Sequence, residues 1–185
     1  GYAIAMAAER RGAVVTLVSG PVSLAVPPGV ERIEVQTCKQ MAREMMYSLS
    51  KADIIIKVAA VADYRPVDPK NRKIKKKDSP SELSISMKQN PDILKMIGEK
   101  KNPDQFLVGF AAETHDLEQN AILKMKKKNL DMIAANRVGS ADSGFKADTN
   151  KVTLLTRDGD CIEIPLMEKD RIAHILLDHM LEKMG

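Results

Sequence analysis

The feature that most constrains the fold is the alternation of short apolar runs with segments of helical spacing. The apolar runs, some continuous and some alternating with polar residues, are predicted to be strands at 13–19, 33–37, 53–60, 83–87, 106–111 and 130–135. Helices are predicted at 2–11, 37–49, 116–129 and 168–184, and another begins at Asn90. Strands that alternate with helices over short connections favour a parallel sheet with helices on both faces. The sequence therefore predicts an α/β fold.

One domain accounts for the whole chain. Its 185 residues can bury a sizeable core and contain neither an internal repeat nor an interdomain linker, so a single domain over 1–185 is predicted. Asp158-Gly159 lies between the strand-like runs 151–156 and 161–165, which is a strong hairpin signal. An amphipathic helix from Glu168 to Met184 follows. We expect a Rossmann-like, mostly parallel sheet with a C-terminal β-hairpin and helix.

The expected location is cytoplasmic. No apolar run approaches the roughly 20 residues of a membrane span, and the N-terminus lacks the basic region of a signal peptide. Cys38 and Cys161 lie far apart in sequence and have no partner at metal-ligand spacing, which fits a reducing compartment. We therefore expect no membrane partner.

Basic residues gather in two places, although the net charge is only +4. Six of the eight residues from Lys70 to Lys77 are basic, as are four of the five from Lys124 to Lys128. Such clusters attract the phosphate groups of a nucleotide, a nucleic acid or a substrate. The chain has no Trp, three Phe and three Tyr, whereas binding of single strands by base stacking usually needs more aromatic surface. Nucleic acid is therefore not the expected partner.

The first candidate binding segment follows the apolar run at 53–60. In an open α/β sheet, ligands bind at the carboxyl ends of the strands. Small residues such as Ala59 would let a flat ring or a ribose approach the backbone, and Asp63 could accept hydrogen bonds from ribose hydroxyls. The alternative is a buried strand followed by a polar turn.

The second candidate is the stretch from Asp63 to Pro80, which is long for a connection inside a compact domain. Connections of this length are usually functional lids or disordered segments. This one carries Lys73, Lys75 and Lys76. The alternative is a solvated run of charge with no ligand.

The third candidate is the helix start Asn90-Pro91-Asp92. Here Asn90 is predicted to cap the helix, Pro91 to fill its first position and Asp92 to face the positive end of the helix dipole. The free N–H groups of a helix start can bind an anion, but capping alone also explains these residue types. Lys124 and Lys128 lie four apart on one helical face, where lysines are more often solvated than ligand-bound.

Familiar catalytic signatures are missing from the sequence. There is no glycine-rich dinucleotide fingerprint, no P-loop and no nucleophile elbow. His115, His174 and His179 show no metal-ligand spacing, so structural roles are expected for them.

Several blocks in a fixed order resemble a known family. The most specific are Ala-Ala-Val-Ala-Asp-Tyr-Arg-Pro at 59–66 and Gly-Phe-Ala-Ala-Glu-Thr at 109–114. Others are Ser-Gly-Pro-Val-Ser-Leu at 19–24, Lys-Ile-Lys-Lys at 73–76 and Asn-Pro-Asp-Ile-Leu at 90–94, followed by 124–129, 135–136 and 144–145. Over essentially its whole length the chain resembles the phosphopantothenate–cysteine ligases. In bacteria these usually form the C-terminal half of a bifunctional protein that also carries a decarboxylase domain.

The resemblance implies a CTP- and Mg²⁺-dependent ligation. The carboxylate of 4'-phosphopantothenate would attack the α-phosphate of CTP to give an acyl-cytidylate and pyrophosphate. The amino group of cysteine would then displace CMP and form the amide. The substrate supplies the nucleophile, which fits the absence of a catalytic triad, while lysines and Mg²⁺ would neutralise the phosphates. A homodimer is also implied, and FMN is not expected in this domain.

The resemblance also implies the residues of the nucleotide site. Lys73, on the long loop, would be the lysine tied to catalysis as well as binding. The implied nucleotide-binding residues are Lys57, Val58, Ala59, Asp63, Lys73, Asn90, Pro91, Asp92, Ile93, Phe110, Lys124 and Lys128. No metal ligand is assigned, because Mg²⁺ can be held mainly by phosphate oxygens.

Three features depart from the family pattern. The family carries an Asn-Arg-Ser-Ser-Gly-Lys-Met segment just before the glycine that corresponds to Gly1, and its Asn is tied to handling of the acyl-cytidylate. The domain is therefore expected to be truncated at its N-terminal edge, with weak turnover to the amide and retained nucleotide binding. Lys57 stands where a small or apolar residue is more common, so only its backbone role is carried over. Arg137 stands where an acidic residue is common.

Two other functions stay open at this stage. One is a non-catalytic nucleotide-binding or regulatory α/β module. The other is a nucleic-acid-binding protein that uses the basic loop, for which binding should depend steeply on salt. The choice of CTP over ATP comes from the resemblance alone.

Overall fold

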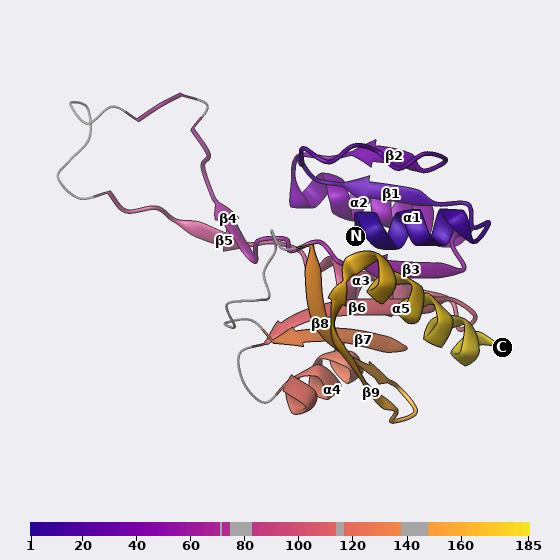
Figure 1. Ribbon diagram of the computed structural model, residues 1–185. Helices are drawn as coiled ribbons and strands as arrows, with labels where there is room; N and C mark the ends of the chain where they lie inside the picture. The colour runs from indigo at the N-terminus through magenta and orange to yellow at the C-terminus, as the bar shows by residue number, and fades with distance from the viewer. Residues whose placement is uncertain (71, 75–82, 114–116, 138–147) are drawn as a thin grey trace.

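The computed structural model describes residues 1–70, 72–74, 83–113, 117–137 and 148–185 (Figure 1). The helices are α1 (Tyr2–Arg10), α2 (Cys38–Ser48), the short 3₁₀ helix η1 (Leu49–Lys51), α3 (Ile93–Lys100), α4 (Leu117–Lys127) and α5 (Lys169–Met184). The strands are β1 (Thr16–Ser19), β2 (Glu31–Glu34), β3 (Ile54–Lys57), β4 (Tyr64–Pro66), β5 (Met87–Gln89), β6 (Phe106–Glu113), β7 (Met132–Arg137), β8 (Thr149–Thr156) and β9 (Cys161–Glu168).

The central sheet has the order β3-β6-β7-β8-β9. Strands β3, β6 and β7 are parallel, whereas β8 and β9 run antiparallel and form the predicted C-terminal hairpin. Strands β1 and β2 form a separate parallel pair, and no backbone ladder joins β1 to β3 within the described residues. The predicted mostly parallel α/β architecture is confirmed, but its strands are divided between sheets.

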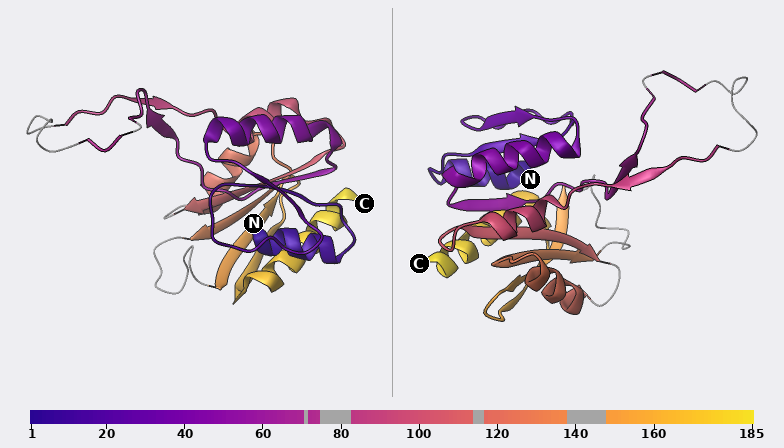
Figure 2. Two further views of the ribbon diagram at one scale, coloured as in Figure 1. Left: turned by 90° about the horizontal axis from the view of Figure 1, so that it is seen from above. Right: turned by 180° about the vertical axis from the view of Figure 1, so that it is seen from behind.

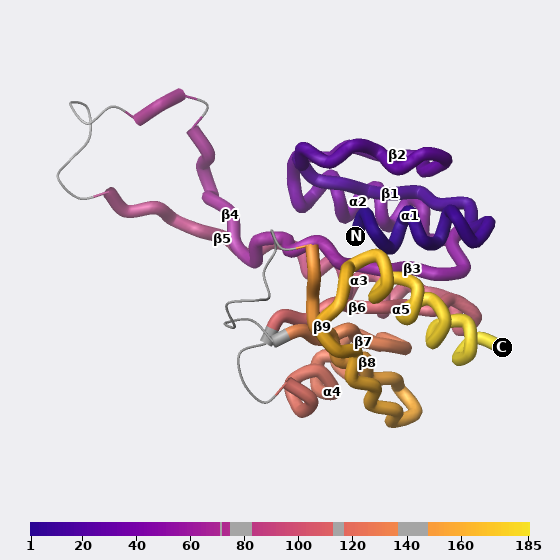
Figure 3. The backbone as a smooth tube through the Cα atoms, viewed as in Figure 1, coloured from indigo at the N-terminus to yellow at the C-terminus, as the bar shows by residue number. Residues whose placement is uncertain are grey.

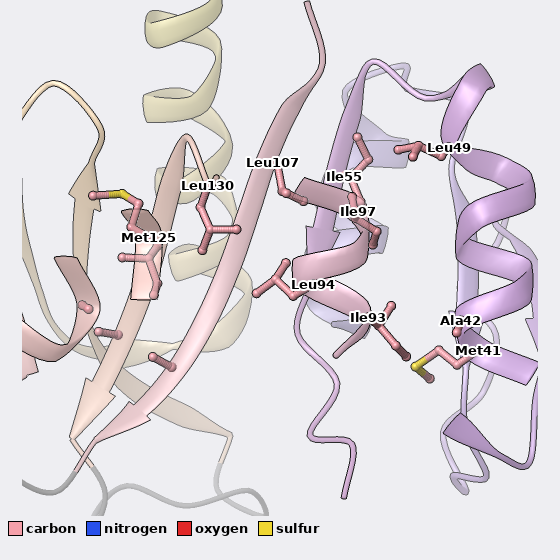
Figure 4. Close-up of a cluster of buried hydrophobic side chains, with 14 of the residues drawn as sticks. Met41, Ala42, Leu49, Ile55, Ile93, Leu94, Ile97, Leu107, Met125 and Leu130 are labelled. Atoms are coloured by element: carbon pink, nitrogen blue, oxygen red, sulfur yellow. The ribbon is translucent and has the colours of Figure 1, made fainter. Parts of the chain in front are cut away.

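Helices cover both faces of the strands, as predicted (Figure 2). One core lies between the sheet and α2, α3 and α4, and the other lies between the sheet and α1 and α5. Side chains along each strand alternate between the cores: Ile55 and Leu107 enter the first, while Ile54 and Val108 enter the second. Figure 4 shows the first core, where Ile93, Leu94 and Ile97 of α3 are buried.

Helix α3 lies very close to its neighbours. A Cβ atom on Gly98 would come within 1.8 Å of the carbonyl oxygen of Lys128, at the end of the α4 region. A Cβ atom on Gly109 of β6 would come within 2.7 Å of Leu130 and 2.9 Å of Leu94. Glycine at both positions therefore lets α3 sit against β6 and against the turn that follows α4.

Several predicted boundaries need correction. Residues 13–15 precede β1 and Val14 is fully exposed, so the buried strand is shorter than predicted. Leu83 and Ile85 are exposed and lie outside β5, which begins only at Met87. Local alternation of apolar and polar residues indicated a strand there, but the neighbouring strand β4 pairs only over three residues.

Strands β4 and β5 form the base of an arm that projects from the domain (Figures 1 and 3). The described parts of the arm carry exposed apolar side chains, including Tyr64, Val67 and Met87. The segment 72–74, with Lys73, lies on this arm and is exposed. A two-stranded ribbon of this kind is only marginally stable without a surface to pack on.

Candidate functional site

Strand β3 ends at Lys57, which pairs in a parallel ladder with Gly109, so the carboxyl end of β3 lies beside the middle of β6. The segment after β3 and the start of α3 meet at this end of the sheet through Asp63 and Asn90. Most of the sequence-predicted site residues lie in these segments.

An ion pair joins the start of α3 to the end of the α4 region. The Nζ atom of Lys128 lies 2.8 Å from Oδ2 of Asp92 and donates to Oδ1 at 3.1 Å. The Lys128 side chain is only 18% exposed, and α3 is close enough for it to reach Asp92 because Gly98 has no side chain. Two predicted site residues from different elements therefore make direct contact.

Asp92 is the N-cap of α3, so the prediction that Asn90 caps this helix is wrong. The Asp92 side chain accepts a hydrogen bond from the backbone N–H of Lys95 at 3.1 Å, and the helix begins at Ile93. Burial acts to raise the pKa of the Asp92 carboxyl, but the hydrogen bonds from Lys128 and Lys95 outweigh it and the pKa lies below its ordinary value. Asp92 is therefore held as a carboxylate.

Asn90 has a different role, at the base of the arm. Its backbone N–H donates to the Asp63 carbonyl oxygen at 2.7 Å, and its side chain donates to the Ala62 carbonyl oxygen at 2.8 Å. Arg65 donates to Oδ1 of Asn90 at 2.7 Å. These bonds occupy the amide that would otherwise cap the helix, and they fix the segment after β3 against the start of α3.

Lys57 joins the same group from β3. It alternates with Ile56, so it lies on the α3 face of the sheet, where it is half-buried and donates from Nζ to the Ala59 carbonyl oxygen at 2.6 Å. Burial and then repulsion from Lys128 lower the pKa of Lys57, although Asp92 acts in the opposite direction. Lys124 also acts on this ammonium group, so Lys57, Asp92, Lys124 and Lys128 form one cluster, here called the lysine cluster.

Cys38 and Arg65 are neighbours of this cluster for which the sequence predicts no role. Cys38, in the first turn of α2, lies with Sγ 3.6 Å from the Pro91 carbonyl oxygen. Burial raises the pKa of its thiol, while Arg65 and Lys57 act against that shift. No motif marks Cys38, and Arg65 could have been noticed only as the basic residue next to Asp63 and Tyr64.

Other predicted residues face elsewhere. The Ile93 side chain is buried beside Met41 (Figure 4), so only its backbone can face a ligand. Phe110 packs against the core of α1 and α5, on the opposite face of β6 from the lysine cluster. Val58 also follows the alternation away from Lys57 and is half-buried. The structure therefore divides the predicted set between the two faces of the sheet.

Among the described residues, the side chains of Lys73 and Asp63 form no hydrogen bond or ion pair with the lysine cluster. Asp63 is exposed and accepts a hydrogen bond through its backbone carbonyl, whereas Lys73 belongs to the exposed segment 72–74 between β4 and β5. Lys75, Lys76, His115 and the block 144–145 fall outside the residues that the structure describes.

A cavity of about 400 Å³, lined by none of the residues of the lysine cluster, lies at the carboxyl ends of β1 and β2. It is lined by the loop 20–23 together with Arg32, Glu34, Val35 and Gln36. Arg32 is already paired with Glu34 and donates to the Leu24 carbonyl oxygen at 3.3 Å. The charged groups of this cavity therefore satisfy one another, and the lysine cluster is the stronger candidate for binding an anion.

Among the described residues there is no group of three or more His, Cys, Asp or Glu side chains that could hold a metal ion. Within the same residues, no helix is long and apolar enough to cross a membrane.

Comparisons with known proteins agree on one family. Residues 1–184 match the family described as DNA/pantothenate metabolism flavoprotein C-terminal domain. The chain is 45% identical over 184 residues to the coenzyme A biosynthesis bifunctional protein CoaBC of Escherichia coli strain K12, covering 99% of this chain and 45% of that protein. It is 45% identical over 181 residues to CoaBC of Bacillus subtilis strain 168, covering 97% of this chain and 44% of that protein.

A solved structure shares the fold, and this chain covers a larger share of it than of the full-length relatives. The crystal structure of the C-terminal domain of CoaBC superposes with a TM-score of 0.81 and 39% sequence identity, covering 99% of this chain and 82% of that one. The chain thus spans less than half the length of the bifunctional relatives, and it corresponds to their C-terminal part.

Proposed function

Because this chain belongs to the family of DNA/pantothenate metabolism flavoprotein C-terminal domains, we propose that it joins cysteine to 4'-phosphopantothenate in coenzyme A biosynthesis. The reaction uses CTP and proceeds through an acyl-cytidylate. The observation that carries the proposal is the lysine cluster, in which Lys128 pairs with Asp92 close to Lys57 at the carboxyl end of β3, and in which Lys124 adds positive charge that acts on Lys57.

The cluster suits the first half-reaction. An oxygen of the 4'-phosphopantothenate carboxylate attacks the α-phosphorus of CTP, and the bond from that phosphorus to the pyrophosphate oxygen breaks. Attack of one anion on another is opposed by charge repulsion, which nearby ammonium groups reduce. In this proposal Lys124 and Lys128 bind the phosphates, and the ion pair with Asp92 supports a role for Lys128 by holding its ammonium group beside the start of α3.

The second half-reaction needs no protein nucleophile. The amino nitrogen of cysteine attacks the acyl carbon, the bond from that carbon to the CMP oxygen breaks, and the amine loses a proton. Lys73 acts in the first step if the arm folds over the cluster, either within one chain or across a homodimer. Closure of the arm would also protect the acyl-cytidylate from water.

Mg²⁺ enters with the nucleotide in this proposal. When bound to the triphosphate it would neutralise charge on the departing pyrophosphate. The described residues offer Asp92 and the exposed Asp63 near the site, which is too few for a metal cage of protein atoms alone.

The wider setting follows from the bifunctional relatives. We propose that the domain works in the cytoplasm as a homodimer, fused to a decarboxylase domain, and that it needs no FMN of its own. The exposed apolar side chains of the arm, such as Tyr64 and Met87, are the surface that a second copy would cover.

The test is an assay of pyrophosphate release. Purified protein is incubated with Mg²⁺, CTP and 4'-phosphopantothenate, with and without cysteine. Release that requires 4'-phosphopantothenate is expected. Binding of CTP without any release would instead favour a non-catalytic nucleotide-binding module.

A variant pair tests the arm. Lys73→Gln should suppress pyrophosphate release without changing the melting temperature. Lys70→Gln is the matched control, because Lys70 lies on the same arm and is paired only with nearby Asp68 in the described structure. Equal rates in the two variants would remove Lys73 from the catalytic step.

A further inference from the structure

Lys57 places an ammonium group at the carboxyl end of β3. It lies on the α3 face of β3 and is half-buried. Its Nζ atom donates to the carbonyl oxygen of Ala59 at 2.6 Å. Ala59 belongs to the predicted nucleotide-binding segment. The Lys57 ammonium group therefore donates to a carbonyl oxygen that lies inside the proposed site.

The groups around Lys57 come from three helices and the turn after one of them. Cys38 of α2 and Asp92 at the start of α3 attract its charge, whereas Lys124 of α4 and Lys128 repel it. The Asp92 carboxylate already pairs with Lys128 at 2.8 Å, so it only partly offsets the positive charge around Lys57. Burial and the neighbouring lysines together make the charged form of Lys57 costly in the absence of a ligand, which lowers its pKa.

We propose that the Lys57 side chain leaves the Ala59 carbonyl when CTP enters and binds the phosphates of the nucleotide directly. This inference rests on the proposed function for the identity of the ligand, and it extends that function by assigning a role to the side chain of Lys57 rather than to its backbone. A partly buried ammonium group held among other cations gains more from an incoming anion than a solvated lysine does. Its departure also frees the Ala59 carbonyl as an acceptor for the nucleotide.

The proposal predicts that CTP binding takes up a proton at alkaline pH. The resting pKa of Lys57 is lowered, and a bound phosphate raises it again. Above the resting pKa the free protein therefore holds Lys57 neutral and must gain a proton on binding, so affinity falls as the pH rises through that value. Above about pH 8 the nucleotide contributes little, because a phosphate of this kind has its second pKa near 6.

Calorimetry measures this linkage directly. Titrations of Mg²⁺–CTP are run in two buffers of different ionisation enthalpy at several values between about pH 7 and about pH 10, near the ordinary lysine pKa. The wild-type protein should show proton uptake that grows with pH. Lys57→Met should lose this uptake and bind CTP about tenfold more weakly, as expected for loss of one charge-assisted hydrogen bond. Lys57→Arg should keep the affinity but lose the uptake, because a guanidinium group stays charged.

Three controls separate this role from others. Lys127→Met removes an exposed lysine from the end of α4 and should change neither affinity nor proton uptake. Cys38→Ser removes the neighbouring thiol and should leave the uptake intact. The melting temperature of Lys57→Met should equal or exceed that of the wild type near neutral pH, because the variant removes a cation that its surroundings disfavour.

The outcomes are distinct. Equal affinity and equal proton uptake in the wild type and Lys57→Met would overturn the proposal, as would an absence of any CTP binding. A lower melting temperature with unchanged affinity would make Lys57 a structural residue. CTP binding with the predicted uptake but without pyrophosphate release would uphold the role of Lys57 and reject only the ligase activity.

Discussion

Asp92 offers the sharpest test of the site geometry, because one carboxylate performs two tasks. Its side chain accepts a hydrogen bond from the N–H of Lys95 and thereby caps α3. The same carboxylate pairs with Lys128 at 2.8 Å. The substitutions Asp92→Ala and Asp92→Asn separate the two tasks, since asparagine caps helices as well as aspartate does but carries no charge.

The expected magnitudes follow from these contacts. Loss of an N-cap costs about 1 kcal/mol of the free energy of unfolding. The ion pair is worth less, about 0.5 kcal/mol, because the Asp92 side chain is 41% exposed to solvent that screens it. For a domain of this size each kcal/mol lowers the melting temperature by about 2–4 °C, so Asp92→Ala should lose roughly 3–6 °C and Asp92→Asn roughly 1–2 °C.

Thermal unfolding followed by circular dichroism at neutral pH measures both variants. High salt should shrink the loss in Asp92→Asn, because it screens the ion pair, and should leave most of the loss in Asp92→Ala. If the two variants unfold at the same temperature, Asp92 does not cap α3 and the reasoning fails. An Asn90→Ala variant supplies the comparison for the base of the arm, where the side chain bonds to Ala62 and Arg65 instead.

The stabilisation that the Asp92 carboxylate gives the folded state depends on pH, and the direction of that dependence follows from its pKa. The folded-state pKa of Asp92 lies below the unfolded value, so its stabilisation is present above the unfolded pKa, near 3.9, and is lost as the pH falls through the folded pKa. Asp92→Asn should therefore differ from the wild type at neutral pH and converge with it in acid. A constant difference across the acid range would contradict this assignment.

Three further predictions concern binding, packing and the C-terminal hairpin. Lys128→Met should weaken CTP binding about tenfold and reduce its salt dependence, measured by calorimetry at two ionic strengths. Gly109→Ala should destabilise the fold by about 1–3 kcal/mol in urea unfolding, because the added methyl would lie 2.7 Å from Leu130; an unchanged midpoint would refute the close packing. Lys183 lowers the pKa of Asp158 to about 2, so this contribution to stability is present above the ordinary pKa of 3.8 and is lost as the pH falls through about 2; an NMR titration should show Lys183→Met returning that pKa toward its ordinary value.

Local patterns in the sequence predicted the elements that depend on neighbouring residues. The helix predicted at 37–49 is present as α2, and Thr37 caps it, with the backbone N–H of Gln40 donating to Thr37 Oγ1 at 3.2 Å. The Asp158-Gly159 turn joins β8 to β9, and Gly159 adopts a positive φ of 104° that the turn requires. These features are encoded within a few residues, so one sequence is enough to find them.

The same local signals misplaced features that depend on competition between partners. Asn90 and Asp92 are both good capping residues, and only the bonds of Asn90 to Ala62 and Arg65 leave the cap to Asp92. Alternation along 83–87 indicated a strand, but pairing with β4 begins only at Met87. In each case the sequence supplied the right residue type and a distant partner decided its use.

The α/β class, the order of the elements and the residue types available for binding phosphate can all be predicted from the sequence, because periodicity and capping act over one or two turns. Which of those residues come into contact depends on long-range packing. Lys57 and Lys128 share one face of the sheet because β3 pairs with β6 and α3 packs closely against the end of the α4 region, while Phe110, next to Gly109 on β6, faces the other core. These contacts depend on the order of the strands and on the distance between helices, and neither can be predicted from neighbouring residues alone.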